Sequence, residues 1–407
     1  MKATHTLRAE ISRSHLRHNF LHLRKAVTPA ADVLAVIKAN AYGHGADLCA
    51  PVLAEAGAQW LGVSSVDEGV SVRNALGGER KPAVLVMCGV WQGEAQAVLD
   101  YALTPVIWQM QQCDLLCAEA KLRNLPPQSL PVHLEIDTGM ARQGVALNQM
   151  EGLLACFTAQ SPLRLDGVMT HLSSTEVLDS PQNAAQVRRF AQALETISRS
   201  GLRPRWVHLG NSSSIDGCTL TREAEMLAEN FGARALVRPG LALYGHTLPL
   251  TRAAAPVAGL VSAGLEPVLA WKTTVLSLRE IAAGCTIGYN ATYIAEHPMR
   301  VALLAVGYAD GLRRELSGSN DRSGGEVLGG EVLIRGRRAP IVGRISMDLT
   351  IADVTAIPET TLGDEVVILG QQGSERITAA DHARIAETIP YEILCGIGAR
   401  VQRVLVD

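Results

Sequence analysis

The stretch Ala35-Val36-Ile37-Lys38-Ala39-Asn40-Ala41-Tyr42-Gly43-His44-Gly45 decides how the rest of the chain is interpreted. An apolar run rich in β-branched residues ends abruptly in Lys38, and a glycine-rich turn follows. A short, bounded run of this kind predicts a buried strand. A lysine at the tip of such a strand is partly desolvated, which lowers the pKa of its amine and permits Schiff-base chemistry near neutral pH. The alternative is a lysine whose side chain simply extends into water.

The composition is that of a protein with a sizeable core. The 407 residues are enough for one large or two ordinary domains, and 47% of them are hydrophobic against 19% charged. A formal charge of −3 gives no reason to expect nucleic acid or an anionic membrane as a partner. The eight cysteines lack the spacing of a zinc site, which favours free thiols in a reducing compartment. With no secretory signal in residues 1–10, we expect a cytoplasmic protein.

Short apolar segments alternate with amphipathic, alanine-rich segments through the first part of the chain. The predicted strands are Val33–Ile37, Trp60–Val66, Ala83–Cys88, Thr104–Trp108, Val132–Asp137, Gly167–His171, Trp206–Leu209 and Ala235–Arg238. The predicted helices are Leu48–Ala56, Asp67–Ala75, Gln92–Leu99, Gln112–Ala120, Gln149–Thr158 and Pro181–Ser198. This alternation is typical of a (β/α)8 barrel, whose parallel strands are buried on both faces. A doubly wound open sheet has the same periodicity.

The pattern changes near residue 248. Thr251–Gly264 resembles a linker, and beyond it short strands are separated by turns, with a loop at Ser317–Gly330 and one helix at Thr378–Thr388. The predicted strands are Val268–Leu278, Arg300–Val306, Glu331–Ile334, Ala339–Arg344, Leu349–Val354, Glu365–Leu369 and Ala399–Leu405. We therefore expect an α/β fold with a barrel domain over residues 1–250 and a mostly β domain over residues 265–407.

Polar residues that suggest chemistry follow the predicted strands of the barrel. They are Lys38, Glu135, Asp137, Arg142, His171, Asn211, Ser212 and Arg238. Each alone has an ordinary explanation, such as a core histidine, an ion-paired arginine or a turn asparagine. The carboxyl ends of parallel barrel strands share one rim, so we expect these residues to converge there. The serines of residues 208–214 suit a phosphate, although a serine-rich helix cap has the same composition.

Four motifs resemble those of alanine racemases, which bind pyridoxal phosphate, and they are spread over almost the whole chain. They are VIKANAYGHG at 36–45, RPGLALYG at 238–245, GYNATY at 288–293 and GRISMD at 343–348. The resemblance implies a (β/α)8 barrel with a β domain, interconversion of L- and D-alanine, and a homodimer. It also implies a supply of D-alanine for peptidoglycan.

The resemblance implies that Lys38 carries the cofactor and that Arg238 faces its pyridine nitrogen. A cation there disfavours protonation of the ring, which weakens it as an electron sink and limits side reactions. The other cofactor-binding residues implied are His171 and Asn211, together with the phosphate ligands Tyr42, Ser212, Gly240, Leu241 and Tyr391.

Racemisation removes a proton from one face of Cα and returns it to the other, so two bases are the natural solution. The resemblance assigns Lys38 to one face and Tyr289, from the partner subunit, to the other. A phenol has a reference pKa of about 10 and needs cationic or hydrogen-bonding neighbours, here His171 and an arginine behind it. Arg142 and the backbone of Met347 would meet the substrate carboxylate. Tyr308 and Tyr391 would narrow the access route and select small side chains.

Glu135 is a departure from the family pattern, in which many members carry a carbamylated lysine that neutralises the arginine. Glutamate is anionic without modification but shorter. We hypothesise that Glu135, or a bound anion, orients Arg142.

Three other functions compete with this interpretation. The first is a broader or serine-directed racemase of the same fold. The second is a cofactor-binding barrel without turnover, which would lack residues 265–407. The third is a barrel-type amino-acid decarboxylase, which would lack the GYNATY and RISMD motifs.

Overall fold

The computed structural model describes residues 7–27, 29, 31–78, 81–320 and 329–407, and it divides into two compact units. The barrel unit comprises Ser14–Ala41 and Ala46–Glu266. The sheet unit comprises the amino-terminal residues up to Arg13, the short piece Tyr42–Gly45, and Pro267–Asp407. Each unit has its own sheet.

The barrel unit contains a closed parallel sheet. Its strands are β2 (Ala31–Val36), β3 (Trp60–Val63), β4 (Ala83–Val86), β5 (Leu103–Ile107), β6 (Leu130–Asp137), β7 (Val145–Ala146), β8 (Leu163–Met169), β9 (Trp206–His208) and β10 (Arg234–Val237). Neighbouring strands are parallel, and pairing of β5 with β6 closes the ring. Since β7 only adds two residues beside β6, the other eight of the nine strands form the barrel. The predicted barrel is confirmed.

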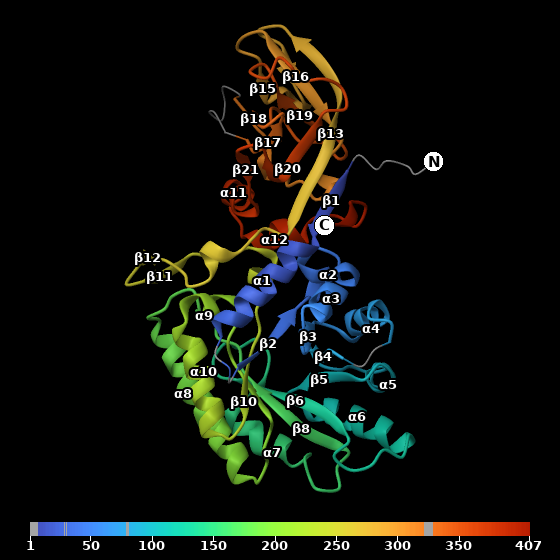
Figure 1. Cartoon of the computed structure of the whole chain (residues 1–407), viewed down its shortest axis with the longest axis vertical. Helices are drawn as coiled ribbons and strands as arrows, with labels where there is room; N and C mark the ends of the chain where they lie inside the picture. Colours follow the sequence, from blue (N-terminus) through green and yellow to red (C-terminus); the bar gives the residue numbers. More distant parts are fainter. Residues whose placement is uncertain (1–6, 28, 30, 79–80, 321–328) are drawn as a thin grey trace. The chain divides into compact units, whose positions relative to one another are not determined.

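Helices follow most of the barrel strands and cover the outside of the ring (Figure 1). They are α1 (Arg13–Ala26), α3 (Ala46–Glu55), α4 (Val66–Ala75), α5 (Ala95–Asp100), α6 (Met110–Leu122), α7 (Met150–Leu154), α8 (Pro181–Arg199), α9 (Ser212–Gly217) and α10 (Thr219–Asn230). The helical pattern in the sequence did not identify α10. The strand observed in the predicted range 60–66 is shorter than predicted, because α4 already begins at Val66.

The segment Thr251–Gly264 is ordered, so its interpretation as a linker is wrong. It contains a hairpin of β11 (Leu250–Arg252) and β12 (Ala255–Val257), followed by a 3-10 turn at Ser262–Gly264. The buried carboxylate of Asp216 accepts hydrogen bonds from the backbone N–H groups of Val261 (2.8 Å) and Ser262 (3.0 Å). These contacts hold the segment in place, although its alanine- and glycine-rich composition predicts no such contacts.

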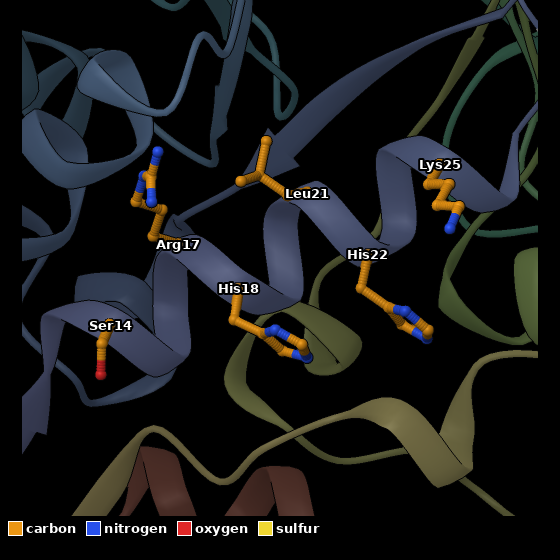
Figure 2. Close-up of a pocket in the computed structure, with 6 residues that line it drawn as sticks. All are labelled: Ser14, Arg17, His18, Leu21, His22 and Lys25. Carbon is orange, nitrogen blue, oxygen red and sulfur yellow. The ribbon is translucent and has the colours of Figure 1, made fainter.

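Helix α1 also holds this segment in place (Figure 2). The rings of His18 and His22 stack with centroids 5.9 Å apart, and their Nε2 atoms lie 2.9 Å from the carbonyl oxygen of Gly264 and 3.1 Å from that of Val261. The same helix face lines a hollow of about 400 Å³, formed by Ser14, Arg17, His18, Leu21, His22 and Lys25. None of the predicted site residues lies there.

The sheet unit is mostly β, as predicted. Its strands are β1 (Arg8–Ser12), β13 (Leu269–Ile281), β16 (Met299–Leu304), β17 (Glu331–Ile334), β18 (Arg337–Pro340), β19 (Thr350–Asp353), β20 (Glu365–Gln372), β21 (Glu375–Ile377) and β22 (Gln402–Val406). A small hairpin, β14 (Thr286–Ile287) and β15 (Tyr293–Ile294), and two helices, α11 (Ala379–Ile385) and α12 (Pro390–Cys395), complete it. The predicted strand at 339–344 is wrong in position because the chain already leaves the ladder at Pro340.

The first strand of the chain belongs to this second sheet. Strand β1 pairs antiparallel with β13 and parallel with β22, so the two ends of the chain lie in adjacent strands. Part of the loop predicted at 317–330 (residues 321–328) lies outside the described residues. Among the described residues, no helix is long and apolar enough to cross a bilayer.

Candidate active site

Lys38 follows the end of β2 and begins a short left-handed turn, α2 (Lys38–Tyr42). Ala39, Asn40 and Ala41 have φ of 51°, 52° and 55°, a conformation that costs roughly 1–2 kcal/mol per residue for L-amino acids. The barrel unit holds the turn through two side chains. Glu68 accepts hydrogen bonds from the N–H of Ala39 and of Ser64, both 2.7 Å, and Asn40 accepts one from the N–H of Ala46 at 2.8 Å. Strain in the turn that follows Lys38 is therefore offset by specific contacts.

The predicted rim residues of the barrel converge. Lys38, His171 and Arg238 follow the carboxyl ends of the parallel strands β2, β8 and β10, and Arg142 lies in the loop after β6. His171 lies within electrostatic range of Lys38, Arg142 and Arg238. The amine of Lys38 is half-buried and has no hydrogen-bond or ion-pair partner among the described residues. It is therefore free to react.

Arg238 is the centre of a buried polar network. Its Nη2 donates to the carbonyl oxygen of Thr170 (2.8 Å) and lies 3.3 Å from Nδ1 of His171, while Nη1 lies 3.1 Å from Nδ1 of His208. A guanidinium only donates, so both imidazoles accept at Nδ1 and carry their proton on Nε2. The Nε–H and the second N–H of Nη1 of Arg238 have no acceptor among the described residues, which leaves two donors for a ligand.

The charges of this network follow from its burial. Burial, then the nearby Arg238, Arg142 and Lys38, lowers the pKa of His171 to about 3, so His171 is neutral at pH 7. Burial also lowers the pKa of Arg238 to about 10, with Glu135 opposing the shift, so Arg238 stays protonated. Of the two kinds of neighbour expected for the Tyr289 phenol, cationic or hydrogen-bonding, the uncharged His171 can be only the second, through its Nε2–H.

A cradle of backbone and hydroxyl hydrogen-bond donors lies after β9 and β10. Ser212 Oγ accepts hydrogen bonds from the N–H of Gly240 (3.0 Å) and of Ala242 (3.3 Å), which brings the two loops together. The N–H groups of Ser213 and Leu241 have no acceptor among the described residues. The Ser212 hydroxyl proton and these two N–H groups are donors of the kind that bind a phosphate, and no acidic side chain pairs with them.

Asn211 caps α9 instead of presenting a free amide. Its Oδ1 accepts from the N–H of Ser214 at 3.0 Å, and its Nδ2 donates to Thr175 Oγ1 at the same distance. Its predicted contact with the cofactor remains a prediction. Asp137 also organises backbone, since its Oδ1 accepts from the three N–H groups of residues 139–141 and shapes the loop that carries Arg142.

Glu135 is buried, with 3% of its surface exposed. Burial raises the pKa of its carboxyl, whereas a hydrogen bond from Gln143 and the charges of Arg238 and Arg142 oppose the shift. The Gln143 amide donates to this carboxylate and, at 2.6 Å, to the carbonyl oxygen of Met87. Glu135 is thus a buried carboxyl group within electrostatic range of two arginines, and Gln143 is the partner that the sequence did not identify.

The remaining predicted residues belong to the sheet unit. Tyr42 is buried, its ring centroid lies 5.8 Å from that of Tyr391, and burial raises the pKa of its phenol. Tyr289, Tyr308 and Met347 are instead exposed, with 65%, 44% and 53% of their surfaces accessible. A Cβ at Gly288 would lie 3.0 Å from the backbone N of Arg344, so the segments that carry Tyr289 and Met347 are packed together.

Sequence reasoning missed three residues of the site: Glu68, Gln143 and His208. Glu68 accepts a hydrogen bond from the N–H of Ala39, and Gln143 donates one to the carboxylate of Glu135. No local sequence pattern marks either contact. His208 had a signal, because it is the first residue of the serine-rich motif and ends a buried strand.

Comparison with known proteins agrees with this geometry. Residues 11–248 match the family model "Alanine racemase, N-terminal domain" and residues 268–405 match "Alanine racemase, C-terminal domain". An alanine racemase of Halothermothrix orenii is 36% identical over 396 residues, which cover 97% of this chain and 95% of that protein.

Two solved structures are similar over nearly their whole length. Alanine racemase from Streptomyces lavendulae has a TM-score of 0.86 and 29% identity, covering 100% of this chain and 98% of the other. The Bartonella henselae enzyme, solved with covalently bound pyridoxal phosphate, has a TM-score of 0.78 and 26% identity, covering 98% and 99%. The chain belongs to the alanine racemase family.

Proposed function

We propose that the protein interconverts L- and D-alanine with two bases, Lys38 and Tyr289, in a homodimer that supplies D-alanine for peptidoglycan. Alanine racemisation with pyridoxal phosphate is the activity of the family. The observation that carries the assignment of Lys38 is its unpaired amine at the rim, beside the Arg238 network and the free N–H groups of the cradle.

The donors around Lys38 fit pyridoxal phosphate. The Lys38 amine would hold the aldehyde carbon, the Nε–H of Arg238 would donate to the ring nitrogen, and Ser212, Gly240 and Leu241 would bind the phosphate with Tyr42 and Tyr391. When bound, the cofactor withdraws electrons from the substrate Cα and makes its proton acidic. Because Arg238 remains protonated, it would disfavour protonation of the ring nitrogen and so restrain the reaction to proton exchange.

The two bases divide the faces of Cα between them. Lys38 takes or returns the proton on one face, and the Tyr289 phenol does so on the other. Neutral His171 supports the phenol through its Nε2–H, since Arg238 occupies Nδ1. Arg142 and the Met347 backbone hold the carboxylate, and Tyr308 and Tyr391 leave room only for a small side chain.

The exposed state of Tyr289, Tyr308 and Met347 supports a shared site. Large apolar and aromatic side chains gathered on a surface are characteristic of an interface. A second copy of the chain would cover them and complete each site. All eight cysteines are free thiols, which supports the cytoplasm as the place of action.

Chiral chromatography after incubation with pyridoxal phosphate tests the activity. L-Alanine should become a racemic mixture, D-alanine should reach the same end point, and L-serine should react far more slowly. Failure to convert either alanine enantiomer by protein that has bound the cofactor would refute the assignment. Equal rates across a panel of L-amino acids would favour a broad-specificity racemase.

Mixing two inactive variants tests the shared site. Lys38→Ala and Tyr289→Phe should each be inactive, but subunit exchange creates heterodimers in which one of two sites has both bases. Random exchange should therefore restore about a quarter of the wild-type activity. If each site were made by one subunit, no activity would return.

A further inference from the structure

One arginine near the end of the chain joins the segments that carry Tyr308 and Met347. The first of these segments, Gly307–Gly311, is organised by Asp310, which is 2% exposed. Asp310 Oδ2 accepts from the N–H of Gly307 at 2.8 Å, and its Oδ1 accepts from Nε of Arg400 at 2.5 Å. Because a buried carboxylate needs a charge partner, Arg400 and Asp310 depend on each other.

The other arm of Arg400 reaches the second segment. Its Nη2 donates to Asp348 Oδ1 at 2.5 Å, and Asp348 is the residue after Met347. The two segments also touch through backbone: the N–H of Tyr308 donates to the carbonyl of Ser346, and the N–H of Ala309 donates to that of Met347, both at 3.0 Å. Two carboxylates bound by one planar guanidinium fix these segments in both distance and direction.

The segment that carries Arg400 has no freedom of its own. The N–H of Gly398 donates to the carbonyl of Asp310 at 2.8 Å. A Cβ at Gly311, whose φ is 103°, would lie 2.1 Å from the carbonyl oxygen of Gly396, so the two backbones are in direct contact. Arg400 therefore acts from a rigid base.

We propose that Arg400 is a positioning residue that holds Tyr308 and Met347 in the spacing that admits alanine and rejects larger amino acids. This inference rests on the proposed roles of those two residues. The pair of Arg400 with Asp348 contributes little to stability because both side chains are half exposed. Loss of the pair with the buried Asp310 would also lower the Tm, so the effect specific to positioning is the change in substrate selection.

Arg338 provides a matched control in the same sheet. It is exposed to a similar degree and binds two carboxylates, those of Glu331 and Glu375, each at 2.6 Å. It has no hydrogen bond to the segments of Tyr308 or Met347. Arg338→Ala thus removes an equivalent charge and pair of contacts without touching the proposed spacing.

The test compares Arg400→Ala, Arg400→Lys, Asp348→Asn and Arg338→Ala in the cofactor-loaded enzyme, with kcat and KM for L-alanine and L-serine and the Tm of each variant. Arg400→Ala should raise KM for L-alanine about tenfold with little change in kcat, and should raise the preference for serine about fivefold. Asp348→Asn should cause smaller changes of the same kind, because it weakens only the surface contact between Arg400 and residue 348. Arg400→Lys should recover stability but not selectivity, because an ammonium cannot bind both carboxylates in a fixed plane.

Three results would overturn the inference. One is an unchanged serine-to-alanine ratio in Arg400→Ala; another is an equal change in Arg338→Ala. The third is full recovery of selectivity by lysine, which would reduce the role to charge. An inactive wild-type enzyme would instead refute the proposed function, so the two failures are distinguishable.

Discussion

The two units present their candidate residues in opposite ways. In the barrel unit, Arg238 is 5% exposed and three of the five N–H donors of its guanidinium are directed at fixed partners. In the sheet unit, Tyr289 is 65% exposed and the nearby Met347 is 53% exposed. One site is organised before any ligand arrives, whereas the other side chains extend from a surface.

This difference separates two tasks. Holding a charged cofactor requires dipoles fixed in place, because their reorganisation would cost binding energy. A second base, and the residues that exclude large side chains, need to approach the substrate from its other side. The residues of one barrel rim cannot reach that side. Under the proposed function, the exposed set is the half of a site that a second copy completes.

The largest effect on activity is expected from a substitution of Lys38 in the barrel unit. Lys38→Ala should abolish both racemisation and the visible absorption of bound pyridoxal phosphate, because no other described amine at the rim can hold the aldehyde. Absorption spectroscopy after cofactor loading checks this. Lys25→Ala on α1 is the control and should keep both signals; a persistent band in Lys38→Ala would contradict the assignment.

Tyr289→Phe removes the proposed base of the sheet unit and leaves Lys38 in the barrel unit intact. It should lower kcat by about 10² to 10⁴, the usual contribution of a general acid–base, while leaving the visible band intact. Exchange of the L-alanine Cα proton in deuterated water should suffer far more than exchange from D-alanine. Tyr293→Phe, four residues on, is the control. Equal losses for both enantiomers would argue against an asymmetric pair of bases.

Acid should weaken the barrel unit before the sheet unit. In the barrel unit, burial lowers the pKa of four histidines: to about 4 for His133 and His246, to about 3 for His171, and well below 6.5 for His208. In the sheet unit, burial lowers the pKa of His382 to about 4. Unfolded histidines bind protons near pH 6.5, so this stability is complete above pH 6.5 and is lost as the pH falls toward 4.

At pH 5.5, each such histidine removes about 1 kcal/mol of stability. Hydrogen exchange at pH 7.5 and 5.5, corrected for intrinsic rates, should show protection falling more in β6, β8 and β9 than in β13, β16 and β20. A uniform loss across both sheets would contradict this prediction.

The smallest effect concerns Glu135. Glu135→Ala removes the carboxyl group that lies within electrostatic range of Arg142 and Arg238, which should raise KM for alanine roughly threefold to tenfold with a smaller change in kcat. Gln143→Ala should show part of the same effect, since it frees the carboxylate that it now holds. Steady-state kinetics measure both, and unchanged KM in Glu135→Ala would reject the role.

The barrel could be predicted because its buried parallel strands are continuous apolar runs, and the rim could be predicted because polar residues end those runs. The left-handed turn at Ala39–Ala41 could not, since neither alanine nor asparagine specifies that conformation and Glu68, which holds it, lies far along the chain. The neutral state of His171 depends on burial and on three neighbouring cations that only the fold assembles. The anchoring of residues 251–264 by Asp216 is equally non-local.

The position of β1 between β13 and β22 has a consequence for biosynthesis. The ladder between β1 and β22 joins strands that lie far apart in the sequence, so β1 keeps one open side until β22 has been synthesised. The barrel can close earlier, from residues that are all made before Pro267. Until β22 emerges, the side of Arg8–Ser12 that does not pair with β13 is available to chaperones or to a neighbouring nascent chain.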